Sequence, residues 1–401
     1  MSDDIEIWLE KHISNDWYCY VKRLSGNDTQ LTGGHQAGPY IPKKIIFDLF
    51  PSLQRGGQLN PRIDFQVAVD SHNAPEHSVN AIWYNNKVID NGTRNECRVT
   101  GWGGCDSPIL DPDATGSICV FCFSKTTESD DSQFCSIWLC QNLHEEDVVE
   151  SVFGIVEPGQ FITRYAGKSH TPPSKPCILD ESSLPPSWVE IFPSGIDIVL
   201  KAIELKPQLL KQVPDKRLLS RRDCEFELFL SVEKVWTLPQ IEKGFDSVDD
   251  FIKLANSVAN RRKARAGRSL EIQAKTIFEE EGLFAFAHDQ VSEGKKRPDF
   301  LFPSIEAYRD PSFSEQNLRM LAAKTTCKDR WRQVLSEADR IPVKHLLTLQ
   351  EGVSLNQFKE MEQEGVVLVV PKPLHKSYPE SIRPKLESLS TFIAETKLLI
   401  S

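Results

Sequence analysis

The feature that most constrains this chain is a segment rich in proline and serine that divides it in two. The segment begins with Gly167-Lys-Ser-His-Thr-Pro-Pro-Ser-Lys-Pro176 and continues with Glu181-Ser-Ser-Leu-Pro-Pro-Ser187. Such composition is typical of a semi-extended linker rather than of a folded element. A chain of 401 residues is also long enough for two domains. We therefore predict domains at residues 1–170 and 188–401, joined by a linker at residues 171–187.

The pattern of apolar residues differs on the two sides of this linker. Before it, short runs rich in β-branched and aromatic residues, such as Asp64–Val69, Asn80–Tyr84 and Ser117–Phe123, are separated by Gly, Asn, Asp and Pro. These runs are typical of strands, and Asn91-Gly92 is a hairpin signal between two of them. The first half is therefore expected to be a β-barrel or sandwich with a few helices.

After the linker, helical and strand patterns alternate. Helices are predicted at residues 196–210, 228–243, 247–259, 269–281 and 328–340, and strands at residues 299–302, 318–325, 345–349 and 365–370. Apolar residues in the helical segments recur with a spacing near 3.6. Strands that alternate with helices indicate an α/β domain.

Charge and targeting features narrow the classes of function. The net charge is −10, whereas a nucleic-acid-binding protein usually shows a basic footprint, so any such footprint must be local. Neither an apolar run of the roughly 18 residues that a membrane span needs nor a basic, apolar secretory signal at Met1–Glu10 is found. We expect a cytoplasmic protein without a membrane partner.

Three basic runs supply local positive charge. They are Arg261-Arg-Lys-Ala-Arg265-Ala-Gly-Arg268, Lys216-Arg217 with Arg221-Arg222, and Lys328-Asp-Arg330-Trp-Arg332. A single run of this kind is more often a solvated helix face. Three runs in one half of the chain, near candidate catalytic residues, favour contacts with phosphate.

Ten cysteines are scattered along the chain, and in a reducing compartment they are expected to be free thiols. Cys119-x2-Cys122 and Cys135-x4-Cys140 come closest to a zinc pattern. However, both lie in apolar runs that read as strands, where cysteine behaves as a small hydrophobic residue. Zinc is therefore the less favoured interpretation, because tight zinc knuckles usually sit on turns.

The segments Arg297-Pro-Asp299-Phe-Leu-Phe302 and Leu321-Ala-Ala-Lys324 carry the strongest chemical signal. Asp299 begins one apolar strand and Lys324 ends another, so two neighbouring strands can bring the side chains together. Phosphodiester hydrolysis needs carboxylates to hold Mg²⁺ and a cation that activates water or steadies the phosphorane charge. Asp299 and Lys324 supply two of these groups.

The second carboxylate is displaced. Such sites often carry it two residues before the lysine, but Ala322 occupies that position. Glu337 is the replacement candidate, provided that the predicted helix after Lys324 lies back across the site; otherwise it is a surface acid. Glu271 borders the apolar stripe of its helix, where it either faces the metal site or serves as a first-turn partner of the helix dipole.

These motifs together resemble the EcoRII-type (type IIE) restriction endonucleases. The likeness covers nearly the whole chain and is carried by the following segments: Arg265-Ala-Gly-Arg-Ser-Leu-Glu271, Arg297-Pro-Asp299, Ala323-Lys-Thr-Thr-Cys-Lys-Asp-Arg-Trp-Arg-Gln333, Lys22-Arg-Leu-Ser-Gly-Asn-Asp28, Thr32-Gly-Gly-His35 and Gly352-Val-Ser-Leu355.

The resemblance implies a multidomain enzyme. It implies an N-terminal, mostly β effector domain with a DNA-binding pseudobarrel and a C-terminal α/β PD-(D/E)XK nuclease. The implied catalytic residues are Glu271, Asp299, Lys324 and Glu337, with Asp299 and Glu337 as Mg²⁺ ligands. The implied enzyme is a homodimer that cuts double-stranded DNA before the first C of CCWGG. It is restrained by the effector domain until a second site binds, and it is paired with a cognate cytosine methyltransferase.

Two charge patterns suit the reading of G·C pairs. On a strand, Arg94, Glu96 and Arg98 share one face, and arginine pairs with guanine while glutamate accepts from cytosine. Lys328, Asp329 and Arg330 repeat the cation, acid, cation order in the second domain. The alternative for each set is a local ion-pair ladder.

Four further residues are weaker candidates for contact with DNA. His35 and Tyr40 match DNA contacts of the effector domain by resemblance. Arg222 and Tyr308 are planar side chains on which a flipped central base could stack, or they are residues of the fold. Gly92 and Cys97 stand where the family carries basic residues, which leaves the strength of effector binding open.

Sequence features oppose two alternative functions. A non-catalytic DNA-binding regulator that retains a nuclease fold is opposed by the intact set of four candidate catalytic residues. A housekeeping nuclease without sequence specificity is opposed by the paired cation, acid, cation sets.

Overall fold

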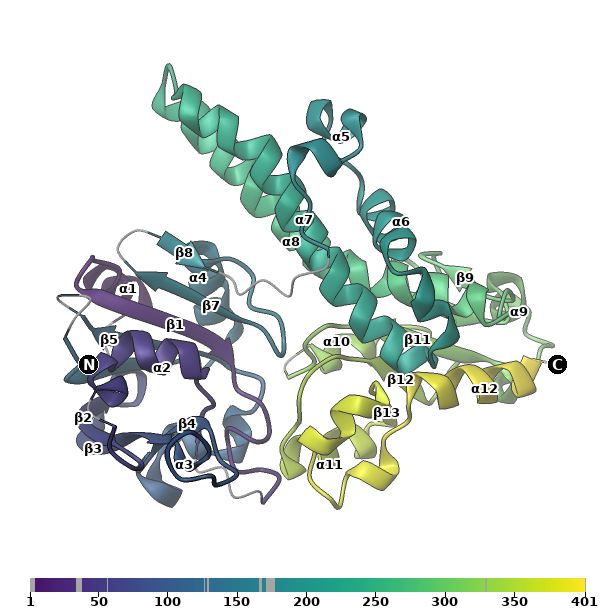
Figure 1. Cartoon of the computed structure of the whole chain (residues 1–401). Coiled ribbons are helices and arrows are strands. Elements are labelled where there is room, and N and C mark those ends of the chain that lie inside the picture. Colours follow the sequence, from purple (N-terminus) through teal and green to yellow (C-terminus); the bar gives the residue numbers. More distant parts are fainter. Residues whose placement is uncertain are drawn as a thin grey trace. The chain divides into compact units, whose positions relative to one another are not determined.

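The chain forms two compact units, which are described separately (Figure 1). This computed structural model describes residues 4–33, 38–55, 57–125, 127, 130–165, 168–170, 177–328 and 330–400. The first unit comprises Met1–Pro172 with Gln350–Phe358 and Lys376–Arg383, and the second comprises the remainder. The two late segments of the first unit fall inside the range predicted for the second domain, so neither unit is one continuous stretch of chain.

The first unit is built on one mixed sheet with the order β4-β3-β2-β6-β5-β1-β7-β8. Its strands are β1 (Trp17–Arg23), β2 (Arg62–Val69), β3 (Ala74–Tyr84), β4 (Glu96–Thr100), β5 (Ile118–Ser124), β6 (Phe134–Leu139), β7 (Phe161–Tyr165) and β8 (Lys168–His170). Neighbours pair antiparallel except β2 and β6, which are parallel. The prediction of a mostly β first half is confirmed, whereas the order of a pseudobarrel stays a prediction.

Both faces of this sheet are covered, because side chains alternate along each strand. In β5, Cys119 packs into the core on one face and Cys122 into the core on the other. The second core also contains residues of α1 (Ile5–His12) and α4 (Leu143–Phe153). Cys119 and Cys122 therefore point away from each other, in agreement with the preference for small hydrophobic residues over a zinc site.

The connection from β3 to β4 is longer than the hairpin signal suggested. It contains α3 (Asn86–Ile89), and Asn91 adopts a φ of 48°. Gly92 follows this residue, and a Cβ built on it would lie 2.5 Å from the side chain of Asn86. A larger residue at this position would require the Asn86 side chain to shift.

The second unit contains a five-stranded sheet of order β13-β12-β11-β10-β9. Its strands are β9 (Ala287–His288), β10 (Phe300–Phe302), β11 (Arg319–Ala323), β12 (Lys344–Leu347) and β13 (Val366–Val369). β9, β10 and β11 pair antiparallel, and β11, β12 and β13 pair parallel. The four predicted strands of this half are confirmed.

Two long helices dominate the rest of the second unit and run side by side in Figure 1. They are α7 (Pro214–Lys243) and α8 (Val248–Glu280), and α12 (Leu389–Ile400) joins them in the core beneath the sheet. The helices predicted at 247–259 and 269–281 are one continuous helix. No helix in the described part of the chain is long and apolar enough to cross a membrane.

The helix predicted at 328–340 is wrong. Only α10 (Trp331–Val334) is helical there, and the chain then turns. Buried Ala338 adopts a φ of 50°, which a right-handed helix cannot contain. Pro342 also disfavours helical backbone at the residue before it.

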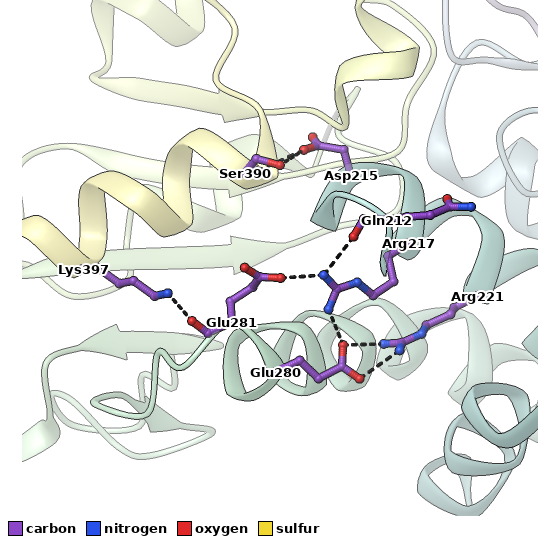
Figure 2. A network of polar contacts seen from close by, with 8 residues as sticks. All are labelled: Gln212, Asp215, Arg217, Arg221, Glu280, Glu281, Ser390 and Lys397. Carbon is purple, nitrogen blue, oxygen red and sulfur yellow. Dashed lines mark hydrogen bonds and ion pairs between the residues drawn. The ribbon is translucent and has the colours of Figure 1, made fainter. Parts of the chain in front are cut away.

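A polar network fixes the start of α7 against the end of α8 (Figure 2). Arg217 donates to Glu280 and Glu281, and Arg221 makes two hydrogen bonds to Glu280 at 2.8 and 2.9 Å. Both guanidinium groups are buried. This basic run therefore serves the fold, and the expectation of phosphate contacts is wrong for these two arginines.

Other parts of the basic runs are also paired internally. Arg265 is buried against Glu225 at 3.1 Å, and Arg262 makes an ion pair with Glu233. The prediction of free thiols fails at one pair, because Cys177 and Cys224 form a disulfide. The reducing compartment was assumed, and sequence spacing could not show that α7 places Cys224 beside Cys177.

Candidate active site

Asp299 and Lys324 lie together at the same end of two adjacent strands of the second sheet, β10 and β11. Asp299 directly precedes β10 and Lys324 directly follows β11, and these strands pair antiparallel with Phe300 opposite Leu321. The Asp299 carboxylate accepts from the backbone N–H of Ala323 at 2.7 Å and from Lys324 Nζ at 3.3 Å. The backbone N–H of Lys324 donates to the carbonyl of Leu347 on β12, so pairing with β12 fixes the backbone position of Lys324.

Glu337 reaches this site from the turn after α10. Burial raises the pKa of Glu337 to about 7; the ammonium of Lys324 opposes the shift and the charge of Asp299 adds to it. Its Oε2 atom is buried and has no hydrogen-bond partner among the described residues. The displaced acid is therefore electrostatically coupled to the predicted pair, although by a turn rather than by the expected helix.

Glu271 approaches the same pair from α8. Burial raises the pKa of Glu271 to about 7, with a further contribution from the charge of Asp299, while Lys324 lowers it. His288 on β9 places Nε2 3.9 Å from Oε2 of Glu271. The sequence reasoning missed His288, and the signal that could have found it is the pairing of His288 with Phe300, next to Asp299.

The donors at this site fit a hard divalent cation. No group of three His, Cys, Asp or Glu side chains in the described residues is close enough to hold a metal by itself. Mg²⁺, however, is usually held by one or two carboxylates together with waters and substrate phosphate. Asp299 and the unpartnered oxygen of Glu337 meet that requirement, and carboxyl groups with raised pKa values gain from a neighbouring positive charge.

The residues of this unit that are predicted to contact DNA differ in how deeply they are buried. Lys328 and Arg330 lie half-buried in the loop between Lys324 and α10, and Asp329 lies outside the described residues. Arg222 and Tyr308 are 3% and 2% exposed, and the Tyr308 hydroxyl accepts from the backbone N–H of Arg340. Both are fold residues in this structure, and their stacking on a base stays a prediction.

The three residues predicted to read bases in the first unit share one exposed face. Glu96 accepts from Arg94 at 2.7 Å and lies 3.2 Å from Arg98, and the guanidinium of Arg94 stacks 3.7 Å from the ring centre of Tyr84. The hydrogen bond from Arg94 lowers the pKa of Glu96. The ion-pair ladder is thus present in the protein alone. Base contact by this face stays a prediction.

The remaining residues of the effector surface are only partly described. Tyr40 is exposed, while its backbone N–H donates to Asp28 and its carbonyl accepts from Tyr20. His35 lies outside the described residues. Cys97 is buried in the core beneath β4, so only the outward positions of this strand can meet a ligand.

Comparison with known proteins identifies both halves. The family model for the EcoRII C terminus matches residues 229–393, and the model for the N-terminal part of restriction endonuclease EcoRII matches residues 13–168. The type II restriction enzyme EcoRII of Escherichia coli is 47% identical over 393 residues, which cover 97% of this chain and 96% of that enzyme. The type II restriction enzyme SsoII of Shigella sonnei is 24% identical over 142 residues, 31% of this chain and 46% of the relative.

Solved structures give weaker likenesses. Metal-depleted Ecl18kI in complex with uncleaved DNA aligns with a TM-score of 0.44 at 19% identity, over 54% of this chain and 85% of that one. The B3 domain of the UbaLAI restriction endonuclease with cognate DNA aligns with a TM-score of 0.24 at 13% identity, over 40% and 98%. The near full-length identity and the two family matches show that the chain belongs to the EcoRII family of type II restriction enzymes and is a site-specific DNA endonuclease.

Proposed function

We propose that Asp299, Lys324, Glu337 and Glu271 carry out Mg²⁺-dependent hydrolysis of double-stranded DNA. The observation that carries this proposal is the arrangement around Asp299. Its carboxylate is held by Ala323 and Lys324. Burial raises the pKa of both Glu271 and Glu337, and the charge of Asp299 adds to the shift of each. Two acids that each interact electrostatically with Asp299 and Lys324 are what a two-carboxylate metal site with a neighbouring cation requires.

Each residue has a distinct part. A bound Mg²⁺ supplies Lewis acidity toward the phosphate and lowers the pKa of a bound water. Asp299 is oriented by the N–H of Ala323 and offers its carboxylate to the ion, and Glu337 offers the oxygen that lacks a partner among the described residues. Lys324 places its ammonium beside Asp299, where it steadies negative charge on the phosphate. Glu271 acts through water rather than as a direct ligand.

The sequence that is cut is proposed from the resemblance and from the charged face of the first unit. Arg94, Glu96 and Arg98 present cation, acid and cation on one exposed face, which suits the stacked G·C pairs at the ends of CCWGG. We propose that a homodimer in the cytoplasm cuts one such site when the first unit binds a second. A cognate cytosine methyltransferase protects host DNA.

Digestion of plasmids tests these proposals together. Plasmids that carry no site, one site or several CCWGG sites are incubated with the full chain and Mg²⁺, and the ends are sequenced. We expect cleavage before the first C, efficient on plasmids with several sites and slow on a plasmid with one. A short CCWGG duplex added in trans should stimulate the one-site plasmid. Equal rates on all plasmids would contradict second-site activation, and other ends would contradict the target.

A further inference from the structure

The turn that carries Glu337 has a backbone that needs outside support. Ala338, the next residue, is fully buried and adopts a φ of 50°. A residue with a Cβ atom in this region is strained relative to right-handed backbone. Within the turn, the backbone N–H of Glu337 donates to Val334 and that of Ile341 donates to Ala338, but neither bond involves the Glu337 side chain. The direction of the Glu337 side chain therefore depends on contacts from elsewhere in the fold.

Lys344, the first residue of β12, makes the contact with the best geometry. Its Nζ atom donates to the carbonyl of Ala338 at 2.6 Å and to the carbonyl of Glu337. Lys344 is 5% exposed, and its own backbone N–H donates to Gly365, so β12 is anchored to β13 at this point. One buried ammonium thus binds two successive carbonyls on either side of the strained residue.

The other contacts of the turn are weaker. Asp339 makes an ion pair with Lys296 at 2.7 Å, but the two side chains are 59% and 36% exposed. Exposed pairs of this kind contribute little to stability. The backbone N–H of Asp339 also donates to Glu293 at 3.2 Å. A hydrogen bond from a charged donor in a buried site is worth more than either.

We propose that Lys344 is a positioning residue for the reaction: it fixes the left-handed turn at Ala338 and thereby aims the Glu337 carboxylate at the metal. The inference rests on the proposed function, in which Glu337 is a metal ligand. Lys344 is 20 residues beyond Lys324 in the chain. Its hydrogen bonds go to the backbone carbonyls of residues 337 and 338, and its ammonium also lowers the pKa of Glu337, against the larger effect of burial. The rescue by Ala338→Gly described below separates the backbone effect from this charge effect.

The test measures metal binding rather than turnover. Full-length protein is mixed with a CCWGG duplex that has a non-hydrolysable linkage at the scissile position. Mn²⁺ is titrated in, and free Mn²⁺ is followed by electron paramagnetic resonance. Loss of a partner that orients a ligand typically weakens metal affinity by about 10- to 100-fold, so Lys344→Met should weaken Mn²⁺ binding at least about tenfold.

Lys397→Met is the matched control. Lys397 also donates its ammonium to a backbone carbonyl, that of Glu281, in the same unit but in the network of Figure 2. This control should lose stability without losing Mn²⁺ affinity. Equal affinity of Lys344→Met and Lys397→Met would overturn the proposal. If Lys344→Met does not fold, Lys344→Gln, which retains a donor group, takes its place with the same expectation in direction.

A rescue experiment isolates the turn. Glycine adopts positive φ without a steric penalty, so Ala338→Gly should recover most of the Mn²⁺ affinity lost in Lys344→Met and change little by itself. Lack of recovery would contradict the role of the turn. Glu337→Gln distinguishes failure of the ligand assignment of Glu337 from failure of the positioning role of Lys344. If it leaves Mn²⁺ binding unchanged, the ligand assignment fails; if it weakens binding and Lys344→Met does not, only the positioning role fails.

Discussion

The two recognition regions of this protein use glutamate in opposite ways. Glu96 in the first unit is half-exposed and paired with two arginines, and the hydrogen bond from Arg94 lowers its pKa. Glu271 and Glu337 in the second unit are largely buried, and burial raises the pKa of each to about 7. Glu96 already has cationic partners within the protein, whereas Glu271 and Glu337 lie where a bound cation would stabilise their charged forms.

This difference indicates which kind of ligand each region suits. A carboxylate already paired within a ladder is preorganised, and its neighbours present donors and acceptors outward as a fixed pattern. A buried carboxyl group with a raised pKa gains most from an ion that arrives later. We therefore propose that the first unit reads the edges of DNA bases and that the second binds metal and phosphate together.

The largest effect is expected at the metal site. Asp299→Asn or Lys324→Ala should lower the rate of CCWGG cleavage by a factor on the order of 10³, because charge stabilisation at the phosphate is lost. Binding of the site without Mg²⁺ should change little. Rates come from single-turnover cleavage, and affinities from gel shifts in EDTA. Asp310→Asn, an exposed acid of the same unit, is the control, and cleavage by Asp299→Asn at the rate of the control would refute the site.

A smaller effect is expected at the charged face of the first unit. Arg98→Ala should raise the concentration of CCWGG duplex that half-stimulates a one-site plasmid by about tenfold, since a good base contact is worth roughly 1–3 kcal/mol. The thermal midpoint should hardly move, because exposed pairs contribute little to stability. Lys11→Ala, which removes an exposed cation from α1, is the control. Identical curves for both variants would mean that the ladder only serves the fold.

The smallest effect concerns stability and pH. With its pKa raised from 4.5 to about 7, each buried glutamate keeps its proton in the folded state at pH values where the unfolded chain has lost it. The metal-free protein should therefore lose stability as the pH rises from about 4.5 to 7. Glu337→Gln retains only the contribution of Glu271 and should lose about half as much, so its thermal midpoint in EDTA should exceed the wild-type value by a few degrees at pH 8 and match it near pH 4.5. A gap that is independent of pH would contradict the raised pKa, and Glu279→Gln on the same helix as Glu271 is the control.

The parts of the fold set by local pattern could be predicted. Apolar runs bounded by polar residues located β10 and β11, and with them Asp299 and Lys324. The position of Glu337 could not be predicted in the same way. It depends on a positive φ at Ala338 that is supported by Lys344, a non-local contact that no helical periodicity encodes.

The basic runs show the same limit. Arg217 and Arg221 read as surface charge in the sequence, but Glu280 and Glu281, about sixty residues later, meet them in the folded chain (Figure 2). His288 gave no signal by itself, because its place beside Glu271 follows from the pairing of β9 with β10. Long-range pairing decided each of these cases.

The most direct test of the nuclease site is proton release when the metal binds. Two acids with pKa values of about 7 are each half protonated at pH 7, so a divalent ion that ionises both should release about one proton per site. Mg²⁺ is titrated calorimetrically into the protein bound to an uncleavable CCWGG duplex, in two buffers of different ionisation enthalpy. We predict release of about one proton at pH 7, which falls toward zero by pH 9 and is roughly halved in Glu337→Gln. Metal binding without proton release at pH 7, or release unchanged by that substitution, would contradict the account.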